Sequence, residues 1–170
     1  FDIEPAAASY LDDRHDNWRA AVYAEDQWTL DPHWTVHIGA RIDRVARQQT
    51  ELSPRIAIVW AANERTTLKL IHGSAFRPPN AYEAYYEIDV PAGYVRNPGL
   101  ESERVSGEEV VAEWRPDSLW RVSGSLYRNR AERLLLLGYD PAIDRYGFAN
   151  SVTLSSHGGD FEVETAQPGC

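Results

Sequence analysis

The 170-residue sequence predicts an all-β fold, an antiparallel sheet of the kind that forms the wall of a transmembrane β-barrel. Three observations predict it. Apolar and polar side chains alternate with a period of two, tight connections alternate with longer ones, and tryptophans lie beside the tight connections. The composition is 43% hydrophobic with six Trp and nine Tyr, which is too apolar for a disordered chain.

Composition and charge exclude several classes of protein. No run of 18 apolar residues is present, which excludes a transmembrane helix but not a barrel, whose apolar signal is diluted by alternation. The net charge of -9 argues against nucleic acid as a partner, since binding it requires clustered Lys and Arg. The single cysteine, Cys170, excludes a disulfide framework. Because the chain begins with Phe1 and has no Met, we expect a piece of a longer protein.

The first two predicted strands form a hairpin. Residues 34–43 alternate strictly, with apolar even positions and with Thr, His, Gly, Arg and Asp at the odd ones. Residues 18–30 show the same alternation, and Asp26 is the one polar residue on their apolar side. Asp31-Pro32-His33 joins the two segments, and this composition is typical of a tight turn.

Five further strands follow the same pattern. The strands containing Ile56–Trp60 and Leu68–His72 flank a turn at 63–65, and those containing 110–114 and 120–126 flank one at 116–118. A seventh strand starts near Tyr146. Its apolar side changes before Phe161, so we expect a bulge or turn at 157–159, His-Gly-Gly.

Connection lengths indicate a membrane barrel. The tight turns at 31–33, 63–65 and 116–118 alternate with longer connections, expected at 44–54, 75–104 and 131–145. All tight turns therefore fall at one end of the sheet. Outer-membrane barrels have short periplasmic turns and long extracellular loops, whereas Greek-key sandwiches mix lengths at both ends.

Tryptophan placement supports the same interpretation. Five of the six tryptophans lie within three residues of a tight turn, on the apolar side of their strands: Trp28, Trp34, Trp60, Trp114 and Trp120. An indole has an apolar body and a polar N–H, which suits the membrane–water interface, so we predict an interface girdle. The opposite sides carry the residues predicted to line a polar lumen: Arg41, Lys69, Glu113 and Arg121.

Several short motifs resemble those of one family. Residues 73–83 read G-S-A-F-R-P-P-N-A-Y-E and are similar to the signature G-x-x-F-R-x-P-x-x-x-E of TonB-dependent outer-membrane receptors. The matching motif residues are Phe76, Arg77, Pro79 and Glu83. Residues 23–28 resemble the family's Y-x-x-D-x-W strand, residues 53–55 its S-P-R, and residues 159–162 its G-x-E.

The resemblance implies a fold and a function. Residues 1–170 would be a partial β-barrel, about seven strands of a plugged barrel with roughly 22, with the plug domain and the C-terminal strands absent. The implied function is a receptor and active transporter in the bacterial outer membrane. It would take up a scarce nutrient, a ferric siderophore or similar metal chelate. Its partners would be this small-molecule chelate, outer-membrane lipid and, through the missing plug, a TonB-type energy-transducing protein; no cofactor and no bound metal are implied.

Aromatic and basic residues in the longer connections are candidates for ligand contact, because Tyr and Arg frequently anchor ligands in wet pockets. The candidates are Arg77, Tyr82, Tyr85, Tyr86, Arg130 and Tyr139. For each of them, loop architecture is the alternative role. Arg77 has five donors that suit a carboxylate such as Glu83 or Glu87.

Nothing in the sequence predicts an enzyme. Nucleophile-elbow, zinc-protease, P-loop and dinucleotide motifs are all missing, and Glu108 and Glu109, being adjacent in a strand, point to opposite faces. The acidic cluster at 12–16 is expected to be a solvated loop. Two alternatives stay open: a soluble β-sandwich carbohydrate-binding module whose tryptophans stack on sugars, and a barrel enzyme with a constellation that the sequence does not reveal.

Overall fold

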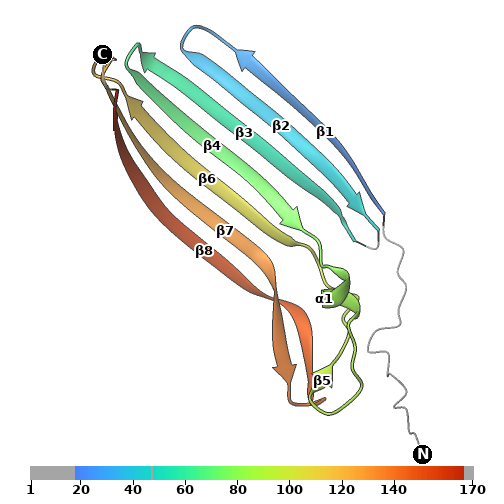
Figure 1. Ribbon diagram of the computed structural model, residues 1–170. Coiled ribbons are helices and arrows are strands. Elements are labelled where there is room, and N and C mark those ends of the chain that lie inside the picture. Colours follow the sequence, from blue (N-terminus) through green and yellow to red (C-terminus); the bar gives the residue numbers. More distant parts are fainter. Residues whose placement is uncertain (1–17, 47, 167–170) are drawn as a thin grey trace, which may run out of the picture.

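The computed structural model describes residues 18–46 and 48–166, so the acidic cluster at 12–16 and Cys170 lie outside the described residues. Within these ranges the chain forms one sheet and one short helix (Figure 1). The elements are β1 (Arg19–Thr29), β2 (Trp34–Val45), β3 (Thr50–Asn63), β4 (Thr66–Arg77), α1 (Ala81–Tyr85), β5 (Gly93–Tyr94), β6 (Glu103–Trp114), β7 (Trp120–Asp140) and β8 (Arg145–Thr165). No helix in the described part is long and apolar enough to cross a membrane.

The sheet is open and almost entirely antiparallel. Its strand order is β1-β2-β3-β4-β6-β7-β8-β5, and only the two-residue β5 pairs in parallel, with the start of β8. The all-β antiparallel prediction is therefore confirmed. Figure 1 shows the long strands side by side, with β1 at one edge and β8 near the other.

No second layer covers this sheet in the described part of the chain. The buried hydrophobic residues there are Val45, Ala84, Leu100 and Leu135, which lie in or near the segments at the long-loop end of the sheet. A β-sandwich requires two sheets with a shared apolar core, and neither is present among the described residues. The soluble-sandwich alternative therefore has no support.

Side-chain oxygens build the three tight turns at the predicted positions. The Asp31 carboxylate accepts the backbone N–H groups of His33 and Trp34 at 2.7 and 3.0 Å. Asp117 accepts those of Leu119 and Trp120 at 2.8 and 3.0 Å, and Asn63 accepts that of Arg65 at 2.9 Å. Asp and Asn bind their own backbone a few residues on, which explains why they occur at these turns.

Two of the three longer connections are shorter than expected. β2 continues to Val45 and β3 begins at Thr50, and β7 continues to Asp140 before β8 begins at Arg145. Only 78–102 is a long connection among the described residues. The strands extend beyond the point where alternation fades because backbone pairing, as in Asp43↔Glu51, does not require an apolar face.

Two irregularities lie between β7 and β8, one on each strand, and neither is at the expected position. Residues 157–159 pair regularly with β7, so they form neither a bulge nor a turn. The register shifts instead on β7 beside Arg133, whose φ of 57° is left-handed, and then on β8, where Ser151 lies between the partners of Leu134 and Leu135. Gly158 serves a packing role, because a Cβ there would lie 2.5 Å from the Tyr127 hydroxyl.

Candidate functional site

The five tryptophans of the predicted girdle share one face of the sheet, here called the tryptophan face. The register places Trp28 opposite Val36, Trp34 opposite Trp60, and Trp114 opposite Val122. Each of the five side chains is exposed, between 37% and 52% of its surface. Large apolar side chains that line a sheet face without a covering layer indicate that something outside this sheet covers them.

Asp26, the one polar residue on the tryptophan face of β1, has a local partner. Its carboxylate accepts the indole N–H of Trp28 at 2.5 Å. On the next two strands, β2 and β3, the rings of Trp34 and Trp60 stack with centroids 5.4 Å apart. The tight-turn end of this face therefore combines apolar ring surface with one internally paired polar side chain, Asp26.

The opposite face, here called the polar face, carries the predicted lumen residues. Glu113 is almost fully buried and forms an ion pair with Lys69, while Arg115 and Arg121 lie 3.4 and 3.7 Å from its carboxylate. Toward the other end, Asp43 is fully buried between Arg19 at 2.8 Å and Arg41 at 2.7 Å. Buried carboxylates are matched by cations on this face, as buried charge requires.

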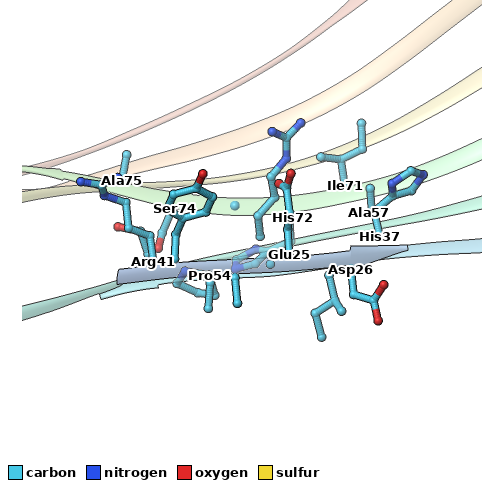
Figure 2. Close-up of a pocket in the computed structure, with 18 of the residues that line it drawn as sticks. Glu25, Asp26, His37, Arg41, Pro54, Ala57, Ile71, His72, Ser74 and Ala75 are labelled. Atoms are coloured by element: carbon cyan, nitrogen blue, oxygen red, sulfur yellow. The ribbon is translucent and has the colours of Figure 1, made fainter. Parts of the chain in front are cut away.

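A hollow of about 1070 Å³ lies on the polar face (Figure 2). In Figure 2, His37, Ala57 and Ile71 point to one side of the sheet and Asp26 to the other. The register brings three lining glycines into one row across the strands, in the order Gly39, Arg55, Gly73 and Gly107. Missing side chains in one row leave space, which gives the wall its hollow.

The family-like motif at the outer end of β4 is a charged clamp. The Arg77 guanidinium donates to both Glu83 oxygens at 3.0 Å, and its Nε donates to Glu103 at 2.5 Å. Glu103 in turn accepts the backbone N–H of Leu135 at 2.8 Å. Arg77 therefore ties together β4, α1, β6 and β7. Of the two carboxylates suggested for it, Glu83 is the partner, and Glu87 lies 3.4 Å from Arg96.

Glu83, one carboxylate of the clamp, also caps the N-terminus of α1. Asn80 accepts the backbone N–H of Glu83 at 2.9 Å, and Glu83 accepts the backbone N–H of Asn80 at 2.8 Å, which together form a capping box. The hydrogen bond from Arg77 lowers the pKa of Glu103 from its ordinary value, and the hydrogen bonds to Glu103 and Glu83 raise the pKa of Arg77. The charged side chains of the motif, Arg77 and Glu83, are thus engaged within the protein.

A continuous cluster of aromatic rings lies beside the clamp and is here called the tyrosine cluster. Its members are Tyr82, Tyr86, Tyr94, Tyr139, Tyr146 and Phe148. Tyr82 stacks on Tyr86 at 4.5 Å, and Tyr146 contacts Tyr139 at 5.1 Å. Through these rings the long connection packs against the extended ends of β7 and β8.

Of the six predicted ligand residues, the structure brings three into the tyrosine cluster: Tyr82, Tyr86 and Tyr139. Tyr82 and Tyr139 are exposed. The Tyr139 hydroxyl donates to Asp144 at 2.6 Å, and this hydrogen bond raises the pKa of Tyr139. Tyr85, at the end of α1, is half-buried.

Arg130 does not join the tyrosine cluster. It lies in β7 opposite Ser106 and Ser155, on the tryptophan face, and its Nε donates to Glu132 at 2.7 Å. Arg77 lies next to the cluster, but its donors are engaged by Glu83 and Glu103. Among the described residues, no group of three or more His, Cys, Asp or Glu side chains is placed to hold a metal ion.

Sequence reasoning groups Tyr94 with the other aromatic residues of the long connection but misses the contribution of Tyr146 and Phe148. Tyr94 reaches the cluster through the parallel pairing of β5 with β8, where it lies opposite Tyr146. Phe148 meets Tyr82 edge-on at 5.9 Å. The sequence does hold a local signal, because Tyr146 and Phe148 alternate along one strand, but no local pattern predicts which loop covers them.

Comparisons with known proteins agree with this geometry. The family model for the TonB dependent receptor-like β-barrel matches residues 2–166. No curated protein matches the chain. Similar solved structures include the siderophore receptor PirA from Pseudomonas aeruginosa, at 21% identity and a TM-score of 0.74 over 85% of this chain and 30% of that one.

Two other similar structures have the same fold. A variant of the ferric enterobactin receptor PfeA from Pseudomonas aeruginosa, in complex with enterobactin, is 21% identical with a TM-score of 0.75, over 85% of this chain and 24% of that one. The FrpB iron transporter from Neisseria meningitidis is 18% identical with a TM-score of 0.70, over 90% of this chain and 24% of that one. The chain therefore spans between 24% and 30% of the length of these proteins.

Proposed function

Because this chain belongs to the TonB-dependent receptor β-barrel family, we propose that it forms one section of the wall of an outer-membrane receptor that actively takes up a scarce nutrient. The remaining strands and a plug domain would come from the rest of the protein. A barrel of roughly 22 strands encloses a lumen wide enough to need such a plug. The resulting function is transport, not catalysis.

The observation that carries this proposal is the uncovered tryptophan face. Its side chains are exposed along the sheet, for example Val22 at 75% and Leu126 at 71%, and no layer of the described residues covers them. In a bilayer, lipid covers such a face, and strand pairing satisfies the backbone groups that lipid cannot bind. The polar face then lines the lumen.

We place the ligand at the outer end, where the tyrosine cluster lies. Tyr82 and Tyr139 are exposed there, whereas Arg77 holds the loop in place through Glu83 and Glu103. The proposed ligand is a ferric siderophore or similar chelate, and the structural similarity to a siderophore receptor and to a ferric enterobactin receptor supports this class. Tyrosine rings offer flat apolar surface and hydroxyl donors to such a ligand.

Energy for uptake would come from a TonB-type partner protein that engages the plug. The sequence has no nucleotide-binding motif that would supply energy directly. The test is uptake of labelled iron by cells that carry the full-length receptor and lack their other receptors. We expect uptake of at least one chelate class, abolished when the energy-transducing partner is deleted. Uptake unaffected by that deletion would contradict active transport, and a receptor that folds in water without detergent would contradict the barrel.

A further inference from the structure

The tryptophans mark a height on five of the strands, β1, β2, β3, β6 and β7. Trp34 and Trp60 are opposite each other, but Trp114 lies opposite Thr66, which is two positions below the Leu68 that pairs with Trp60. Trp120 lies lower again, opposite Thr165 near the end of β8. From β2 to β7, each row of directly opposite residues therefore lies progressively farther from the tryptophans, toward the long-loop end. This stagger is the one that strands tilted in a barrel wall show.

On β2 and β3 the tryptophan face stays apolar over the full height of a bilayer. Every second residue from Trp34 to Ile42 and from Trp60 to Leu52 is apolar, and the next positions are Arg44 and Thr50. At about 3.3 Å per residue and a tilt of about 40°, the ten residue steps from Trp34 to Arg44, or from Trp60 to Thr50, rise about 25 Å. That is about the height of the apolar band on outer-membrane barrels.

On β6 and β7 the apolar run ends earlier. Counted from Trp114, Val110 is the last apolar position and Glu108 follows at position six. Counted from Trp120, Leu126 is the last and Arg128 follows at position eight. Polar side chains therefore enter the band about 5 to 10 Å below its outer limit on these strands.

These polar residues form two rows on the tryptophan face. The first row runs from β4 to β8 and contains His72, Glu108, Arg128 and His157, each opposite the next. The row above it, on β6 to β8, contains Ser106, Arg130 and Ser155. Directly opposite residues have Cβ atoms about 5 Å apart, so neighbouring side chains of a row can hold one ligand together.

Two of the basic residues have no anion within ion-pair distance among the described residues. His72 lies 3.8 Å from Glu108, which is an ion pair only when His72 is protonated, and Arg130 is paired with Glu132. Arg128 and His157 are exposed and have neither an ion pair nor a hydrogen bond among the described residues. An unpaired charge within the apolar band is costly, and a long Arg can reach the interface but a His cannot.

We propose that Arg128 and His157, flanked by Ser106 and Ser155, bind the phosphate of an anionic lipid in the outer leaflet; this rests on the membrane location proposed above. A guanidinium binds phosphate through paired N–H donors, and the imidazole and hydroxyls add further donors. Below the site, Leu126 and Phe161 provide apolar surface. The order along β7, basic above and apolar below, matches the order of phosphate and acyl chains in a lipid.

The test is native mass spectrometry of the full-length receptor in detergent, titrated with dioleoyl phosphatidic acid and with dioleoylglycerol, which has the same acyl chains without the phosphate. We expect bound phosphatidic acid to survive delipidation and dioleoylglycerol not to. Arg128→Gln and His157→Gln should each weaken phosphatidic acid binding about tenfold, since each removes a charge-assisted hydrogen bond. Inorganic phosphate added alone should not compete, because it lacks the acyl chains that contact the apolar surface.

The matched control is Arg44→Gln, which removes an arginine of the same face whose partner is Thr50 at 3.1 Å. It should leave binding within about twofold of the wild type, because it lies at the headgroup level and outside the two rows. Equal binding of the two lipids, or equal losses in all three variants, would overturn the site. Since the lipid comparison uses the wild-type receptor, it stands even if a variant fails to fold. A receptor that inserts and transports but binds no phosphatidic acid would refute this inference alone.

Discussion

Arg77 Nε donates to Glu103 Oε2 at 2.5 Å, and this bond joins the last residue of β4 to the first residue of β6. The two residues are also opposite each other in the strand register. The bond therefore closes the connection 78–102 at its base. Through Glu83 the same guanidinium reaches α1, so the outer loop is held at its base and at its first turn by one side chain.

Removing this guanidinium should loosen the long connection. Arg77→Ala leaves Glu83 and Glu103, whose side chains are only 11% and 14% exposed, without their cation. We expect a loss of about 1–3 kcal/mol in the stability of the loop and faster proteolysis within 78–102. The control is Arg96→Ala, whose pair with Glu87 is largely exposed and should contribute about 0–1 kcal/mol. Equal protease sensitivity of the two variants would contradict the clamp.

The clamp should also be sensitive to acid. Arg77 holds the pKa of the Glu103 carboxyl below its ordinary value of 4.5, so the folded loop binds this proton less readily than the unfolded loop. The stability from this pair is therefore complete above the unfolded pKa and is lost as pH falls through the folded one. Protease resistance of 78–102 should stay constant from neutral pH down to about 5 and fall below about 4.

Glu103→Gln provides the comparison for the acid test. This variant has no carboxylate at that position and should lack this part of the pH dependence. Glu83, which shares the same arginine, stays in place, so the loop should keep partial protection. An identical acid profile in Glu103→Gln and wild type would show that other groups control the transition.

The sequence predicted the repeating part of this fold and missed the part that depends on distant contacts. Alternation and turn residues such as Asp31 locate the hairpins because both signals are local. The extended ends of β7 and β8 were not predicted, because these segments are polar or uniformly apolar and show no alternation. Backbone hydrogen bonds pair them, as at Leu137↔Phe148. The tyrosine cluster required the contact of Tyr94 with Tyr146, and local sequence does not specify that contact.

Gly93 should be essential for the contact between Tyr94 and Tyr146. A Cβ at Gly93 would clash with the backbone oxygen of Ile88 and lie 2.7 Å from that of Val90, and main chain cannot move aside as a flexible side chain does. Gly93→Ala should displace β5 and separate Tyr94 from the cluster, at a cost of about 1–3 kcal/mol. Loop proteolysis and tyrosine fluorescence measure this effect. Gly99→Ala is the matched control, because its nearest neighbour is the Asn97 side-chain oxygen at 3.4 Å.

The affinity for a chelate should distinguish a role of the tyrosine cluster in ligand binding from a role of the tryptophan face. Tyr82 is 47% exposed and stacks on Tyr86, so Tyr82→Ala removes exposed ring surface from the proposed ligand site. We expect its affinity for a ferric siderophore to fall by about 1–3 kcal/mol, or about 5- to 150-fold, in fluorescence-quenching titrations of the full-length receptor. Arg130→Gln should leave that affinity unchanged, because the register places Arg130 on the tryptophan face, away from the lumen. The opposite result, with Arg130→Gln defective and Tyr82→Ala normal, would place the ligand site on the tryptophan face and would be incompatible with lipid contact there.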